Sequence, residues 1–153
     1  MFSFKQWKLL SNKLPNYLLV VLFISVVITT NVLAETWKRG TEQEVKRGKK
    51  LYVTHCQTCH GVNGVGGQPI SSFVRNPDYI VPPALDDSQH AWHHSDEDLI
   101  ETILEGSPRT TQMPAWKSIL SKRDAADLVA YMKSLWSDRA LSCQGPKHMS
   151  CMH

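Results

Sequence analysis

The chain has 153 residues, of which 42% are hydrophobic and 20% charged, so it is neither a disordered tail nor a protein that crosses a membrane many times. Its formal net charge of +3 comes from three lysines that precede the first acidic residue: Lys5, Lys8 and Lys13. From Glu35 onward, basic and acidic residues are equal in number. This balance excludes nucleic acid as an expected partner, because such proteins need a basic surface.

The first 34 residues follow the order of a secretory signal peptide. A basic start leads into an apolar run over residues 17–28, and Val32-Leu33-Ala34 places small side chains at the positions that a signal peptidase reads. We therefore expect residues 1–34 to be a signal peptide and the mature protein to begin at Glu35. The alternative is an uncleaved anchor, because the apolar stretch approaches the thickness of a bilayer. Both interpretations place the rest of the chain in the periplasm, either soluble or anchored to the inner membrane.

Three amphipathic segments after the leader predict helices. Thr41 and Glu44 have the spacing of a capping box at the start of the first helix, which runs toward Cys56. Ser95 precedes an acidic first turn and begins a second helix that ends at Gly106. A third helix begins at Ser121, and its apolar residues recur at the spacing of a buried stripe as far as Trp136.

The segments between these helices predict loops rather than strands. Residues 61–83 are rich in glycine and proline, which prevents long regular structure and suggests that this segment wraps around something. Residues 107–116 form a second predicted loop. Because no segment has the alternation of a strand, the expected fold class is all-α.

The sequence Cys56-Gln-Thr-Cys59-His60 is the Cys-x-x-Cys-His pattern of covalent haem attachment. Two thiols at this spacing can bond the two vinyl groups on one side of a porphyrin, and the next histidine then lies under the iron. A thioredoxin-like pair is a poorer interpretation, because a helix rather than a strand leads into the motif. A zinc site would need a second pair of ligands, which only the C-terminal cysteines could supply. The motif therefore predicts one covalent haem c.

Met113, before Pro114 in the second loop, is the expected second axial ligand of the iron opposite His60. A loop thioether can project toward the iron, whereas Met132 lies in the apolar stripe of the third helix and is expected in the core. Ligation by His60 and Met113 raises the iron potential relative to two histidines. Two axial ligands also leave no open coordination position on the iron for a substrate, so catalysis is not expected.

Four other histidines are rival ligands, and we expect none of them to bind the iron. His93 and His94 flank the start of the acidic helix and are expected to be solvated, and His55 adjoins Cys56 on a helix already committed to the haem. His90 is the fourth.

The order of these features resembles the class I cytochromes c of the bacterial, single-haem type. The resemblance covers residues 41–136 and rests on the haem motif, on Pro82-Pro83-Ala84-Leu85, on Met113-Pro114-Ala115-Trp116 and on the last helix. It implies a small fold of three main helices around the haem, with the first and last helices crossing near Gly48 and Tyr131. It also implies that the carbonyl of Pro82 or Pro83 accepts a hydrogen bond from His60, which would orient the ring.

Several aromatic and charged residues are candidates for the wall of a haem pocket. Trp116 is the strongest of them, because it follows Met113 by three residues. Trp92 and Tyr79 are further candidates, and an ordinary core position is an equally good interpretation of Trp92. Arg109 could pair with a haem propionate, although a lone loop arginine is more often solvated.

The C-terminal tail, residues 137–153, departs from the family pattern. Cys143 and Cys151 remain as an even pair, and a local disulfide is the simpler interpretation in an exported protein. The alternative is a copper site, because soft and borderline donors crowd together in this tail: Cys143, His148, Met149, Cys151, Met152 and His153. A disulfide would remove most of the affinity for copper, so the two interpretations compete.

These features predict an exported electron-transfer protein with a cytochrome c domain over residues 35–136. Its expected partners are redox proteins such as a respiratory oxidase, reductase or dehydrogenase, with membrane association possible through the N-terminal segment. One alternative is a haem c subunit or domain of a redox enzyme. Another is a copper-handling cytochrome that uses its tail.

Overall fold

The computed structural model describes residues 39–68 and 79–151 of the chain. The expected signal peptide or anchor at residues 1–34 lies outside these residues, as do Met152 and His153. Within the described ranges, no helix is both long and apolar enough to cross a membrane.

The three predicted helices are all present, and the described residues contain no strand, so the prediction of an all-α fold is confirmed. Each helix begins at the predicted N-cap, where a hydroxyl accepts the backbone N–H three residues later and completes a capping box. The helices are α3 (Glu42–His55), α5 (Asp96–Glu105) and α6 (Lys122–Ser134), and the caps are Thr41, Ser95 and Ser121.

Five short elements are additional to the predicted helices. They are too short to show a hydrophobic period in the sequence, which is why the pattern does not reveal them. They are α4 (Gln57–His60), η1 (Val62–Gly64), η2 (Ala91–His93), α7 (Asp138–Ser142) and η3 (Gly145–Cys151), where η marks a 3₁₀ helix. Two of them, α7 and η3, build the tail into a folded unit.

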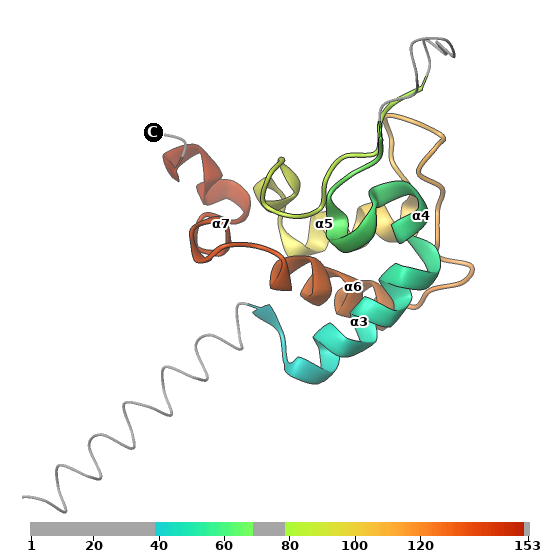
Figure 1. Ribbon diagram of the computed structural model, residues 1–153, viewed down its shortest axis with the longest axis horizontal. Coiled ribbons are helices and arrows are strands. Elements are labelled where there is room, and N and C mark those ends of the chain that lie inside the picture. Colours follow the sequence, from blue (N-terminus) through green and yellow to red (C-terminus); the bar gives the residue numbers. More distant parts are fainter. Residues whose placement is uncertain (1–38, 69–78, 152–153) are drawn as a thin grey trace, which may run out of the picture. The chain divides into compact units, whose positions relative to one another are not determined.

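Helices α3 and α6 pack directly against each other, as Figure 1 shows. They approach most closely at Gly48, where a Cβ atom added to the glycine would lie 1.9 Å from the Asp127 carbonyl oxygen. Next to this point, the rings of Tyr52 and Tyr131 lie 5.1 Å apart between centroids. The expected crossing near Gly48 and Tyr131 is therefore where the two helices meet. Arg47 also binds the buried Asp127 carboxylate through two hydrogen bonds, of 2.6 and 2.8 Å.

The core consists of two neighbouring clusters of apolar side chains that share α6. One lies between α3 and α6 and contains Tyr52, Leu120, Leu128 and Tyr131, with Cys56 and Trp116 packed against it. The other joins α5 and α6 to the tail and contains Ala91, Leu99, Val129, Met132, Trp136, Ala140 and Leu141. Met132 is thus a core residue, as its place in the apolar stripe predicts.

Candidate functional site

The Cys-x-x-Cys-His motif lies where α3 ends and α4 begins. The backbone N–H of Cys56 still donates to the Tyr52 carbonyl, and the N–H of His60 donates to the Cys56 carbonyl at 2.9 Å. The short helix α4 therefore places Cys56 and Cys59 one turn apart. Both are free thiols; Cys56 is half-buried against the core and Cys59 is exposed. The motif thus offers two thiols held at a fixed spacing by the backbone.

Burial controls the protonation of Cys56. Loss of hydration raises the pKa of its thiol to about 11, and the nearby Cys59 contributes in the same direction. Cys56 is therefore a neutral thiol at neutral pH. A neutral thiol is a poor ligand for a free metal ion, because metals bind the thiolate.

The ring of His60 is buried, with 8% of the residue exposed, and its orientation is fixed by one hydrogen bond. Its Nδ1 atom lies 2.9 Å from the carbonyl oxygen of Pro83, and since a carbonyl can only accept, Nδ1 carries the proton. The lone pair is then on Nε2. Burial lowers the pKa of His60, with the hydrogen bond to Pro83 opposing that shift. A neutral ring with one free nitrogen is the form of histidine that binds metals.

The two prolines that the resemblance singles out have different partners. Pro83 accepts the hydrogen bond from His60, whereas the Pro82 carbonyl accepts the backbone N–H of Gly67 at 2.9 Å. The Gly66 N–H in turn donates to the His60 carbonyl at 2.8 Å. Gly66 has φ +90°, which favours glycine, and a side chain there would press on the backbone of Ala84. The Gly-rich loop thus holds the proline segment against the motif.

Tyr52 connects α3 to the residue that follows the motif. Its hydroxyl donates to the Gly61 carbonyl at 2.6 Å, and burial raises its pKa to about 12. A phenol that is protonated and buried at every physiological pH is a fixed donor. Tyr52 therefore helps to hold the motif in place from its C-terminal side.

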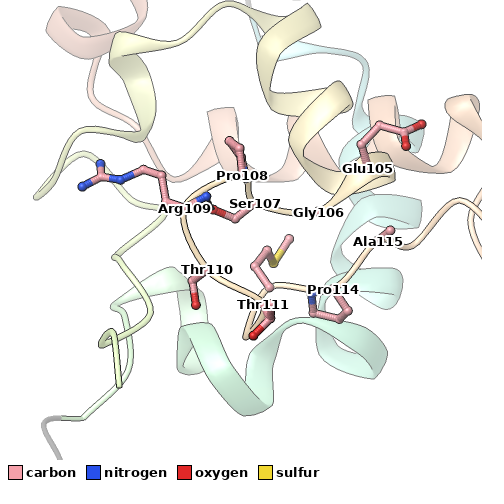
Figure 2. Close-up of a pocket in the computed structure, with 10 residues that line it drawn as sticks. Glu105, Gly106, Ser107, Pro108, Arg109, Thr110, Thr111, Pro114 and Ala115 are labelled. Atoms are coloured by element: carbon pink, nitrogen blue, oxygen red, sulfur yellow. Dashed lines mark hydrogen bonds between the residues drawn. The ribbon is translucent and has the colours of Figure 1, made fainter. Parts of the chain in front are cut away.

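Met113 lies in the loop between α5 and α6, as predicted, and is half-buried beside a cavity of about 480 Å³. Figure 2 shows Ser107 and Pro108 along one edge of the loop, with Thr111 and Pro114 along the opposite edge. The lining residues all come from the segment 105–115, and the motif cysteines and His60 are not among them.

Two hydrogen bonds hold the Met113 loop in shape. The N–H of Ser107 donates to the Met113 carbonyl at 3.1 Å and closes the loop on itself. The N–H of Ile80 donates to Oε1 of Gln112 at 2.9 Å and ties the loop to the chain that leads into the proline segment. This role of Gln112 was not identified from the sequence, because a glutamine in a loop is not part of any recognisable pattern.

The other predicted pocket residues are distributed between two places. Trp116 packs edge to face against His55, with ring centroids 5.2 Å apart, and belongs to the cluster that contains Cys56. Trp92 instead packs against the cluster shared by α5, α6 and the tail, the ordinary core role. Tyr79 is half-buried, and Arg109 is exposed with its guanidinium extending away from the loop in Figure 2.

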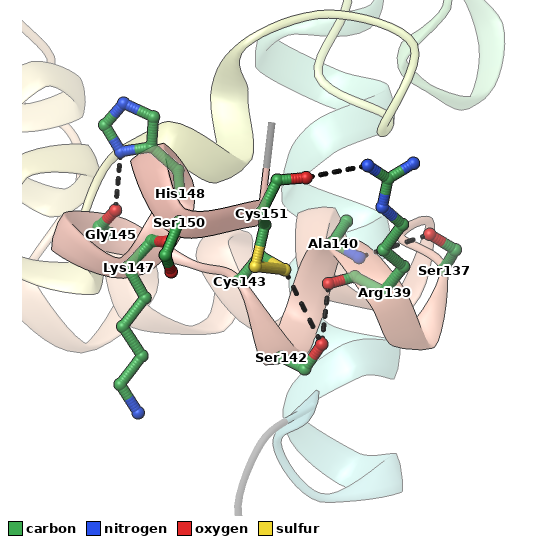
Figure 3. Close-up of a disulfide and its surroundings, with 10 residues drawn as sticks. All are labelled: Ser137, Arg139, Ala140, Ser142, Cys143, Gly145, Lys147, His148, Ser150 and Cys151. Atoms are coloured by element: carbon green, nitrogen blue, oxygen red, sulfur yellow. Dashed lines mark hydrogen bonds between the residues drawn. A yellow bond between two sulfur atoms is a disulfide. The ribbon is translucent and has the colours of Figure 1, made fainter. Parts of the chain in front are cut away.

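The tail contains a disulfide between Cys143 and Cys151, drawn in Figure 3. This bond removes both thiolates from the proposed copper donors and corrects that interpretation, because the remaining imidazole and thioether groups are weaker ligands. Among the described residues, no group of three histidine, cysteine or acidic side chains is placed to hold a metal ion. His148 donates through Nδ1 to the Gly145 carbonyl, and Met149 is exposed.

The expectation that His93 is solvated was wrong. His93 is half-buried, with its ring edge to face on Trp92 and stacked on His148 of the tail. The partner comes from a segment far along the chain, so no local pattern predicts this packing. His94 is exposed, as expected.

The donors around the motif fit a covalently attached haem. Two free thiols one turn apart match two vinyl groups, and the buried His60 has its Nε2 lone pair free because Pro83 occupies Nδ1. Met113, a half-buried thioether, lies in a separate loop beside a cavity that the motif residues do not line. The chain thus contains each kind of group that attachment and ligation require.

Comparisons with known proteins add an independent finding. Residues 43–132, more than half of the chain, match the family described as cytochrome c oxidase, cbb3-type, subunit III. The chain is 27% identical over 108 residues to the cbb3-type cytochrome c oxidase subunit CcoP of Azospirillum sp. strain B510, covering 71% of this chain and 34% of that protein. It is 30% identical over 96 residues to subunit FixP of Azorhizobium caulinodans, covering 63% and 29%.

A third relative is subunit CcoP of Azospirillum brasilense, 29% identical over 99 residues, which are 64% of this chain and 31% of that protein. The chain therefore spans about a third of the length of the curated relatives that it matches. No solved structure is a significant match.

Proposed function

Because the chain belongs to the cytochrome c family described as cytochrome c oxidase, cbb3-type, subunit III, we propose that it is a haem c subunit or domain of a respiratory oxidase. In that role it carries single electrons and does not itself catalyse a reaction. This is the alternative that the sequence leaves open beside a free-standing carrier, and the names of the relatives favour it. The observation that carries the proposal is the buried His60, which is hydrogen-bonded to Pro83 and follows the free thiols of Cys56 and Cys59 in one motif.

Each site residue has a defined task in this proposal. Cys56 and Cys59 would hold the haem as thioethers, and His60 would bind the iron through Nε2 while Pro83 fixes its ring. Met113 would provide the second ligand from its loop, and Trp116 packs beside the motif. When bound, the haem supplies reversible one-electron chemistry at iron.

We further propose that the protein works in the periplasm, with residues 1–34 as signal peptide or anchor, residues 35–136 as the cytochrome domain and residues 137–153 as an added tail. The Cys143–Cys151 disulfide supports this location, because disulfides persist in oxidising compartments. Its expected partners are the other subunits of the oxidase or a protein that supplies it with electrons.

The proposed function is tested by electron transfer to an oxidase. The haem-loaded chain is first reduced, and the reductant is then removed. Air should reoxidise it at least about tenfold faster when a purified cbb3-type oxidase that lacks its own subunit III is present than when no oxidase is present. Stopped-flow absorbance measures the rate. Equal rates with and without the oxidase contradict the proposal, and cyanide, which blocks the oxidase, is the control.

The Met113 ligand is tested separately. The ferric protein should show the weak far-red charge-transfer band of iron bound to a thioether, and Met113→Ala should lose the band and gain carbon monoxide binding in the ferrous state, because it opens a ligand position. Met132→Leu is the matched control: that methionine is buried in α6 and its replacement should keep the band. A band that survives in Met113→Ala shows that another side chain is the ligand.

A further inference from the structure

Four histidines gather where the tail meets the segment before α5. His90, His93 and His94 come from η2 and its flanks, and His148 comes from η3. The rings of His93 and His148 are stacked, with centroids 4.5 Å apart and planes 13° from parallel. The ring of His90 lies 6.3 Å from that of His93 and 5.9 Å from that of His94. The stack is the point at which η3 contacts η2 through aromatic rings.

The rest of the tail is fixed by other groups. Ala140 and Leu141 of α7 are buried in the core, and Gln144 donates to Asp96 at 2.6 Å and to the His94 carbonyl at 3.2 Å. The disulfide closes the loop from Cys143 to Cys151, and Arg139 donates to the Cys151 carbonyl at 2.7 Å (Figure 3). The disulfide links Cys151, at the end of η3, to Cys143, which is buried, so it keeps that end of η3 near the domain. Between its two ends, η3 contacts η2 through the histidine stack.

The stack suits two neutral rings or one charged ring, but not two charged rings. At 4.5 Å, two imidazolium ions repel each other, and protonated His90 and His94 and the ammonium of Lys147 add charge of the same sign. Three carboxylates lie nearby. Asp96 is already paired with Lys133 at 2.8 Å, Asp98 bonds the neutral Ser95 and faces His94, and Glu97 is exposed to solvent. At most two of them are therefore left to offset the charge of four protonated histidines and Lys147.

We propose that η3 is a pH-dependent clasp, which stays docked on η2 while the His93–His148 stack holds at least one neutral ring and detaches when both rings are protonated. A cavity of about 320 Å³ already lies at this contact in the docked state, and its lining includes Trp92, Arg139 and Cys151. Detachment removes the Cys151 wall of this cavity and uncovers Trp92. The proposal does not depend on the haem.

Docking of η3 favours the neutral form of the His93 ring, and this sets the direction in which docking depends on pH. Burial lowers the pKa of His93 from 6.5, and His148, His90 and His94 lower it further in that order. A histidine whose pKa is lower in the docked state gives docking its full stability above the ordinary pKa of 6.5. That stability is lost as pH falls below 6.5.

The clasp is tested by hydrogen exchange on the full chain between about pH 8 and pH 5. After correction for the intrinsic rate, exchange of the η3 amides should rise about tenfold at the acid end, while amides of α3 and α6 stay protected. His148→Phe and His93→Phe each keep a stacked ring that cannot be protonated, so either should reduce the rise to less than about twofold. His90→Gln, which leaves the stack intact, should keep most of it.

Two results would overturn the proposal. One is wild-type exchange in η3 that does not change with pH, and the other is an undiminished rise in both phenylalanine variants. If those variants are undocked at every pH, the titration of the two rings followed by NMR in the wild type decides. Their protonation must coincide with the rise in exchange, and titration without a change in exchange refutes the clasp.

Discussion

Serine in place of both Cys56 and Cys59 is expected to leave the chain without covalently bound haem when it is produced in a host with haem-attachment machinery. The hydroxyl of serine does not add to a vinyl group as a thiol does, and the two free thiols of the motif are the groups placed for that bond. The content of covalent haem should fall from one per chain to none. It is measured by absorbance of the protein after acid-acetone extraction, which removes haem that is not bonded to sulfur.

The chain contains its own matched control for this experiment. The double variant Cys143→Ser, Cys151→Ser removes the same number of sulfur atoms from the tail disulfide and should keep its full haem content. Colour that resists extraction in the motif variant would show that the haem is bonded elsewhere. Loss of haem in both variants would indicate that general misfolding is the cause.

The secondary structure near the site could be predicted because its signals are local. The capping boxes at Thr41, Ser95 and Ser121 define the helix starts within a few residues, and Gly106 ends α5 with φ +85°. The motif and its spacing are likewise contained in five consecutive residues. Local signals of this kind do not depend on how the chain folds back on itself.

Contacts between distant segments could not be predicted in the same way. The sequence leaves Pro82 and Pro83 as equal candidates, and the hydrogen bond to His60 at Pro83 depends on how the Gly-rich loop packs. The stacking of His93 on His148 depends on the fold of the tail, for which no periodic pattern exists. Tertiary packing determines such pairs, and a single sequence contains no direct signal for it.

Alanine at Gly48 is expected to destabilise the protein by about 3 kcal/mol or more, although alanine is the better helix former by about 1 kcal/mol. The added carbon would lie 1.9 Å from the Asp127 carbonyl oxygen and 2.9 Å from Cβ of Tyr131. Those atoms belong to the α6 backbone and to a buried residue, so α3 and α6 must separate to admit it. Separation also disturbs the packing of Tyr52, whose hydroxyl holds Gly61 beside the motif.

Whether Gly48→Ala raises or lowers the free energy of unfolding decides between the two effects. Denaturant unfolding of the purified chain measures the free energy, and Lys49→Ala, on the exposed face of the same helix, should change it by less than about 0.5 kcal/mol. If helix propensity were dominant, Gly48→Ala would be more stable than the wild type, and the close crossing of α3 and α6 would be wrong. A large loss of stability instead shows that α3 and α6 meet closely at Gly48, and this contact helps to position the end of α3 and therefore Cys56.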